Sequence, residues 1–96
     1  MKESKFQSET IKEIEERFPG AIVTKMDANY IQGIPDVLVL YNNHWGTLEF
    51  KKSGNASHQP NQDYYVNRMN DMSFSAFIFP ENKEEVLNEM ARSFET

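Results

Sequence analysis

The sequence predicts an α/β domain whose mixed central sheet is flanked by helices. Three observations favour this class: apolar residues recur at helical spacing over residues 3–18, four short β-type runs follow, and a second helical segment separates the third run from the fourth. A helix joining two strands favours a parallel pairing between them. The predicted order is therefore α-β-β-β-α-β-α within one domain spanning residues 1–96.

The first helix is expected over residues 3–18 and ends at Pro19-Gly20, because both residues are helix breakers. Its inward face has spacings of four, three and four, at Gln7, Ile11, Ile14 and Phe18. Three runs suit strands, at 21–26, 35–41 and 47–52, and turn-forming residues at 42–46 separate the last two. Pro35 opens its run, where a strand tolerates proline.

The C-terminal part of the chain is expected to alternate helix, strand and helix. Pro60 suits the first turn of a helix that reaches about Met69. Apolar residues at 74–79 predict the fourth strand. Asn82, with Glu85 three residues later, resembles a capping box and predicts the start of the last helix. The apolar face of that helix consists of Val86, Leu87, Met90 and Phe94.

Composition narrows the class of protein. Ninety-six residues, 39% of them hydrophobic, suit one small folded domain. The absence of cysteine excludes disulfides, zinc-thiolate sites and thiol catalysis. Ten basic and fifteen acidic residues argue against a protein that coats nucleic acid, although an enzyme that grips phosphates locally remains compatible. No apolar run approaches the ~20 residues of a membrane span, so we expect a cytoplasmic protein.

Two acidic residues and a lysine are placed to converge on neighbouring strands. Asp36 follows Pro35 at the start of one expected strand, and Glu49 and Lys51 lie two residues apart in the next. Side chains alternate along a strand, so Glu49 and Lys51 share one face while Leu48 points into the core. Two carboxylates held close together resist ionising unless a cation lies between them. This arrangement is typical of metal-dependent phosphodiesterases.

The chemistry expected at this centre is metal-assisted hydrolysis. Asp36 and Glu49 can hold Mg²⁺ together with the backbone carbonyl of Phe50 and waters, which matches the preference of magnesium for oxygen ligands. The ion would polarise a scissile phosphate and lower the pKa of a bound water. Lys51 would orient that water or stabilise charge on the phosphate. Mn²⁺ is expected to substitute for Mg²⁺.

A structural alternative exists for each of these residues. Glu49 and Lys51 also fit a solvated strand face with a weak surface ion pair, worth ~0–1 kcal/mol. Pro35-Asp36 also fits ordinary turn chemistry at the entrance to a strand. Their placement on adjacent strands, in this order and within this αβββαβ frame, favours the nuclease interpretation.

The chain resembles a minimal member of the PD-(D/E)XK nuclease superfamily, and within it the small VRR-NUC nucleases that phages often encode. The resemblance spans nearly the whole chain and is carried by Glu3-x-x-Phe6-Gln7, Gly33-Ile34-Pro35-Asp36, Glu49-Phe50-Lys51, and Ser57 followed by Gln62. It implies a restriction-endonuclease-like αβββαβ core and a metal-dependent DNA endonuclease. The Val-Arg-Arg tripeptide that names the branch is absent, and residues 74–79 contain no basic residue.

The resemblance also implies roles for further residues. An acid on the first helix joins the metal site in that family, and Glu3 occupies the matching position. The glutamine that follows the Glu-x-Lys motif maps best to Gln62, with Gln59 as the competing choice. Candidates to contact nucleic acid are Gln7, Lys52, Ser57, His58 and Gln59.

The small phage nucleases imply a structure-selective activity on branched DNA such as Holliday junctions. Symmetric cutting of a junction needs two sites related by a two-fold axis, so a homodimer is expected. The alternative is a non-catalytic nucleic-acid- or protein-binding module that retains the nuclease fold. Metal-dependent cleavage distinguishes these two possibilities.

Overall fold

Four strands form one mixed sheet in which each strand pairs with its neighbour in the chain. The computed structural model describes residues 2–95. Its elements are α1 (Glu3–Arg17), β1 (Ile22–Lys25), β2 (Val37–Tyr41), β3 (His44–Phe50), α2 (Pro60–Met72), β4 (Phe74–Ile78), the 3₁₀ turn η1 (Pro80–Asn82) and α3 (Lys83–Ser93). The spatial order is β1-β2-β3-β4, with β3 and β4 parallel and the other pairs antiparallel. The predicted order of elements and the parallel pairing are confirmed.

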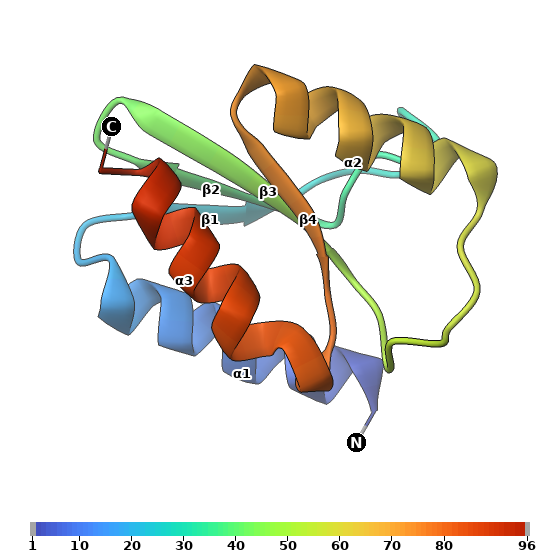
Figure 1. The fold of residues 1–96 in the computed structure, drawn as a ribbon, viewed down its shortest axis with the longest axis horizontal. Coiled ribbons are helices and arrows are strands. Elements are labelled where there is room, and N and C mark those ends of the chain that lie inside the picture. Colours follow the sequence, from blue (N-terminus) through green and yellow to red (C-terminus); the bar gives the residue numbers. More distant parts are fainter. Residues whose placement is uncertain (1, 96) are drawn as a thin grey trace.

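The sheet lies between two layers of helix (Figure 1). The helices α1 and α3 lie together on one face, where Lys83 of α3 forms an ion pair with Glu13 of α1 at 3.1 Å. The helix α2 lies on the other face, against β3 and β4. No helix among residues 2–95 is long and apolar enough to cross a membrane.

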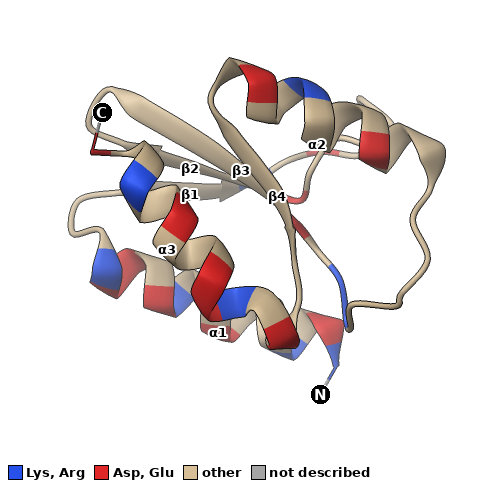
Figure 2. Cartoon of the chain, in the orientation of Figure 1, with Lys and Arg blue, Asp and Glu red and all other residues tan. Residues whose placement is uncertain are grey.

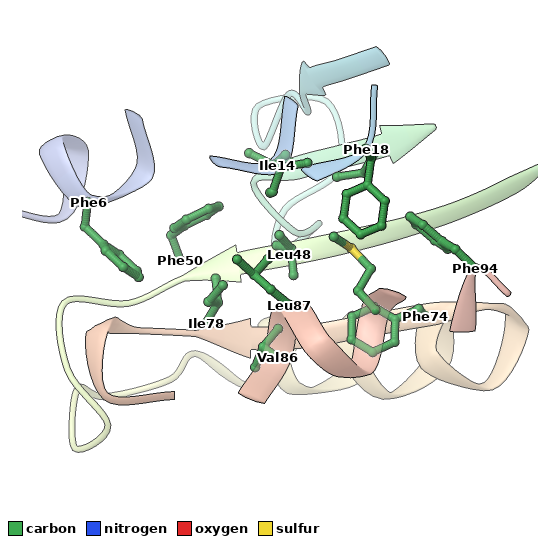
Figure 3. Packing of buried hydrophobic residues seen from close by; sticks show 13 residues of the cluster. Phe6, Ile14, Phe18, Leu48, Phe50, Phe74, Ile78, Val86, Leu87 and Phe94 are labelled. Carbon is green, nitrogen blue, oxygen red and sulfur yellow. The ribbon is translucent and has the colours of Figure 1, made fainter. Parts of the chain in front are cut away.

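The hydrophobic core fills the space between the sheet and the pair α1 and α3 (Figure 3). The core side chains are almost fully buried and come from both helices and from all strands except β1: Phe6, Ile14, Phe18, Val37, Val39, Leu48, Phe50, Phe74, Ile78, Val86, Leu87, Met90 and Phe94. Leu48 and Phe50 point into this layer, as predicted. Because strand side chains alternate, Glu49 lies on the opposite face, beneath α2.

The hairpin between β2 and β3 is tighter than expected. Tyr41 pairs directly with His44, so the turn consists of Asn42 and Asn43 alone. Asn42 has a φ of 55°, a left-handed conformation that asparagine tolerates better than most residues. The prediction that residues 42–46 form a turn is therefore wrong, because the last three of them begin β3.

Two other boundaries differ from expectation. The helix α2 runs to Met72 rather than to about Met69. The Asn82 side chain does not cap α3; it accepts a hydrogen bond from the Phe79 N–H at 2.8 Å and donates to the Phe77 carbonyl at 3.1 Å. The Asn82 side chain thus holds the backbone at the end of β4 through these two hydrogen bonds, and η1 connects β4 to α3.

Candidate active site

The register between β2 and β3 brings the carboxyl groups of Asp36 and Glu49 together. Val37 pairs with Leu48, so the next step outward sets Asp36 opposite Glu49. Directly opposed residues in an antiparallel pair project from the same face of the sheet. The two predicted acids therefore meet at the end of the hairpin, on the α2 side.

A backbone hydrogen bond fixes the position of the Asp36 carboxylate. The N–H of Phe50 donates to Asp36 Oδ2 at 2.8 Å. The backbone carbonyl of Asp36 also accepts a hydrogen bond from the Met26 N–H at 2.8 Å, which holds this residue at the entrance to β2. A carboxylate anchored in this way has little freedom to turn away from Glu49.

Glu49 is an unusual carboxyl group because only 4% of its surface is exposed. Burial raises its pKa to about 8, from an ordinary value of 4.5, and the neighbouring Asp36 charge is the next cause. A side-chain hydrogen bond with Asp36 and the charge of Glu3 act in the same direction on this pKa, whereas the charge of Lys51 lowers it. The pair of acids therefore favours a bound proton or a bound cation.

The amide of Gln62 connects Glu49 to Lys51. Gln62 Nε2 donates to Glu49 Oε2 at 3.0 Å, and Gln62 Oε1 accepts from Lys51 Nζ at 2.8 Å and from the Gln59 N–H at 3.0 Å. Both groups that face Oε1 are donors only, so the network admits one orientation of the amide. Of the two competing glutamines, the structure brings Gln62 to the group formed by Asp36, Glu49 and Lys51, which we call the centre. Gln59 is the N-cap residue of α2, and its backbone carbonyl accepts from the Gln62 N–H at 2.9 Å.

Lys51 is also buried, with 8% of its surface exposed. Its Nζ donates to the Ser57 carbonyl at 3.1 Å in addition to Gln62, and its backbone N–H donates to the Ile78 carbonyl at 2.9 Å. A solvated strand face is therefore excluded for Glu49 and Lys51. The Gln62 amide forms hydrogen bonds with both side chains and so bridges them in place of a direct ion pair.

The acid predicted on the first helix lies farther out. Glu3 is exposed in the first turn of α1, and Gln7, one turn later, is half-buried. The charge of Glu3 contributes to the raised pKa of Glu49, so the two groups lie within electrostatic reach. Within residues 2–95, however, no three His, Cys, Asp or Glu side chains are grouped closely enough to hold a metal ion. The structure thus brings Asp36 and Glu49 together but does not bring Glu3 into the same cluster.

The fold can be compared with known proteins. No protein-family model matches the chain, and no curated protein matches it. A solved structure described as a VRR_NUC domain superimposes with a TM-score of 0.63 and 23% sequence identity, over 84% of this chain and 92% of that one. The fold is that of a VRR_NUC domain. The expected restriction-endonuclease-like architecture is confirmed.

On this VRR_NUC fold, His58 occupies a defined position beside the centre. Its ring stacks on Phe77 with centroids 3.9 Å apart, and its Nδ1 lies 3.0 Å from Asp63 Oδ1. Phe77 is the β4 residue that pairs with Glu49, so the imidazole lies over the strand next to the acids. The other candidates for contact with nucleic acid on this side, Lys52, Ser57 and Gln59, are exposed.

Asp63 was missed by the sequence analysis, although its spacing carries a signal. His58 immediately precedes the residue that caps α2, and Asp63 is the fourth residue of the helix. Side chains at these two positions commonly contact each other as a hydrophobic staple. In this VRR_NUC fold an imidazole and a carboxylate occupy the staple positions.

Gly33 sets the distance between α2 and the loop that precedes β2. Its φ is +89°, and a Cβ built on it would lie 2.3 Å from Asn61 Cβ and 2.8 Å from the Asn61 carbonyl carbon. Only glycine permits this approach. The contact holds the first turn of α2, and with it Gln62, against the segment that leads to Asp36.

Proposed function

We propose that this chain is a Mg²⁺-dependent endonuclease that hydrolyses DNA phosphodiester bonds by in-line attack of water. The observation that carries the proposal is the pairing of two carboxyl groups, Asp36 and Glu49, with a buried lysine joined to them through Gln62. The VRR_NUC fold supports the nuclease class. A surface used only for binding would not require three ionisable groups to be gathered and desolvated at a strand end.

The donor set suits a hard divalent cation. Asp36 and Glu49 offer carboxylate oxygens, and the raised pKa of Glu49 reflects burial first and then the neighbouring charge of Asp36, which a cation would neutralise. The N–H and C=O of a strand residue project from the same side, so the Phe50 carbonyl lies on the side of the Asp36 carboxylate. These three residues would hold Mg²⁺, with Glu3 completing its environment through water. When bound, the ion supplies Lewis-acid polarisation of the phosphate and a water of lowered pKa.

Lys51 and Gln62 perform the remaining steps. The Lys51 ammonium orients the attacking water or stabilises charge that develops on the phosphate oxygens. Gln62 holds Lys51 in place through its carbonyl oxygen and directs its amide toward Glu49 and the substrate. Because both side chains are already positioned by hydrogen bonds, little reorganisation is needed when DNA binds.

DNA approaches from the α2 side of the sheet. Acidic residues outnumber the interspersed lysines and arginines on α1 and α3, on the opposite face, which disfavours the approach of a phosphate chain there (Figure 2). Lys52, Ser57, His58 and Gln59 lie on the segment between β3 and α2 and contact the backbone beside the cut. Gln7 contributes from α1, at the margin of this surface.

We further propose that the substrate is branched DNA such as a Holliday junction and that the enzyme acts in the cytoplasm as a homodimer. Two-fold symmetry would allow paired cuts. The helix α2 leaves the outer face of β1 and β2 uncovered, and Ile22 and Leu40, which are cross-strand partners, are 62% and 38% exposed. Light scattering of the wild type and of Ile22→Asp tests this assembly. A monomeric wild type would contradict it.

Cleavage assays test the catalytic proposal. Forked, four-way-junction and linear DNA are incubated with Mg²⁺, Mn²⁺ or a chelator, using the wild type, Asp36→Asn and Lys51→Ala. Cutting that needs metal and disappears in both folded variants supports the enzyme. Binding without cutting in every metal would instead identify a non-catalytic module that retains the nuclease fold.

A further inference from the structure

A polar cavity of about 350 Å³ lies directly beside the proposed centre. It opens between the loop before β2 and the first turn of α2, and its walls are Gln32, Gly33, Gln59, Pro60, Asn61 and Gln62. Gln62 is shared, because its amide also contacts Glu49 and Lys51. A group in the cavity would therefore be a close neighbour of a phosphate bound at the centre.

The lining of the cavity indicates the class of ligand. None of the six residues carries a charge. A metal subsite would need carboxylates, and a phosphate subsite would need cationic side chains or several free N–H groups at a helix start. Here Pro60 has no N–H, and the N–H groups of Gln59 and Gln62 are already bonded within the helix start. Four of the six residues carry side-chain amides, each of which offers both a donor and an acceptor. The edge of a nucleobase presents the same mixture of donors and acceptors, and Asn and Gln are the side chains that pair with it in two-point contacts.

Two of these amides are available for a ligand. The Gln32 side chain has no hydrogen-bond partner within residues 2–95, and Asn61 makes only a long contact of 3.4 Å to the Gln32 carbonyl. Gln62 is held at the centre, and Gln59, the N-cap residue of α2, bonds Gln62 through its backbone N–H. Gln32, from the loop, and Asn61, from the helix, both line the cavity.

Helical spacing brings an aromatic residue to the side of α2 that carries two of the cavity residues. Tyr64 is 58% exposed, and it follows Pro60 by four residues and Asn61 by three, so it shares their face of α2. Bases that leave a duplex or occur in single strands are commonly stacked on such rings. An exposed tyrosine near one amide without a partner and one with only a long hydrogen bond is the combination expected for an unstacked base.

We propose that this cavity binds an unpaired nucleobase of the DNA strand that is cut, next to the scissile phosphate, with Gln32 and Asn61 contacting its edge and Tyr64 its face. This inference rests on the proposed nuclease function for the position of the phosphate. It explains a preference for branched DNA, since branch points supply bases that are already unpaired and cost little to extrude.

Fluorescence of 2-aminopurine tests the proposal. This adenine analogue brightens when it leaves the base stack, and it is placed in turn at each nucleotide around the branch point of a junction. The complex is formed with Ca²⁺, so that binding is measured without cutting. The wild type is expected to brighten one position strongly, and Gln32→Ala and Asn61→Ala should each reduce that signal. Asn43→Ala removes an exposed amide in the β2–β3 turn, at the far end of β2 from Asp36; it is the matched control and should leave the signal unchanged.

An abasic nucleotide at the responding position provides the second measurement. Without the base, DNA binding by the wild type should weaken about tenfold. On the abasic DNA, Gln32→Ala should bind as tightly as the wild type does. Equal losses by this variant on intact and abasic DNA would overturn the proposal, as would the absence of any responding position.

The proposed nuclease activity and the proposed base site can be rejected independently of each other. Metal-dependent cutting without a responding position would retain the nuclease and reject the base site. A responding position without cutting in any metal would retain the base site and reject the nuclease. Thermal melting of each variant confirms that it is folded.

Discussion

The backbone N–H of Phe50 donates a hydrogen bond of 2.8 Å to the carboxylate of Asp36. This contact joins the end of one strand to the entrance of the next, and it points an acid from β2 toward Glu49. The same hydrogen bond preorganises the site. A carboxylate that accepts a backbone hydrogen bond is held in place before any ion or substrate arrives, so the arrangement at this end of the sheet is built into the fold.

The substitution Asp36→Asn removes the negative charge at this position and keeps a side chain of nearly the same shape. The asparagine oxygen can still accept from the Phe50 N–H, so the melting temperature should change little. Loss of the negative charge should remove Mn²⁺ binding, measured by calorimetry, and reduce cleavage by about a hundredfold or more. Retained metal affinity in a folded Asp36→Asn protein would show that Asp36 is not a ligand.

The stability of the metal-free protein should fall as the pH rises from about 4.5 to about 8. In this window the folded protein retains a proton on Glu49 that the unfolded chain has released, because the pKa of Glu49 is raised to about 8. The folded state then binds more protons, so stability decreases with pH, by an amount on the order of a few kcal/mol. Urea denaturation at pH 5, 6.5 and 8 measures it.

The variant Glu49→Gln and added Mg²⁺ are the controls for this pH dependence. Glutamine has no proton to lose, so the variant should be at least as stable as the wild type at pH 8 and should lack most of the decline. Mg²⁺ should stabilise the wild type more at pH 8 than at pH 5, because it binds the ionised carboxylate. A large loss of stability in Glu49→Gln at pH 8 would identify Glu49 as a structural residue instead.

Lys51→Met should remove activity without unfolding the protein. Methionine retains the buried apolar stem but not the ammonium, so cleavage should fall by about a hundredfold or more, mainly in kcat. Lys52→Met is the matched control, since the neighbouring lysine is exposed. It should weaken DNA binding modestly, with an effect that diminishes as salt is added. Equal effects of the two substitutions on kcat would argue against a direct role for Lys51.

Gly33→Ala should destabilise the protein through a steric clash as well as through backbone strain. The new Cβ would overlap Asn61, so a loss of about 2 kcal/mol or more is expected. Gly20→Ala is the control for backbone strain alone, because Gly20 has a φ of +90° and a Cβ added there would meet nothing within 4 Å. This substitution should lower the stability by about 1 kcal/mol. Denaturant unfolding compares the two. Similar losses for both would mean that the loop before β2 does not need its close contact with α2.

The sequence was sufficient to predict the order of the elements and the meeting of Asp36 with Glu49, but not the turn that makes the meeting possible. A turn over 42–46 would pair Tyr41 with Thr47 and set Asp36 opposite Lys52. Glu49 would then project from the other face of the sheet. His44, Trp45 and Gly46 are all compatible with a turn, so local preferences do not reveal that β3 begins at His44.

The sequence favoured Gln62 over Gln59 but did not decide between them. Both residues are near the start of α2, and which of them reaches the acids depends on how that helix is seated on the sheet. The close contact of Gly33 with Asn61, between segments that are far apart in the chain, helps to set this position together with the packing of α2 on β3 and β4. Local periodicity indicates the face of a helix but not its height above a strand.

The residues Gly46–Lys51 are buried without interruption, since one set faces the core and the other faces α2. Each position in this segment is therefore constrained by packing on one side or by the polar centre on the other. Among diverging relatives, substitutions should accumulate last in these six residues and first on the outward surfaces of α1 and α3. This stretch of β3 is accordingly the best probe for finding distant homologues.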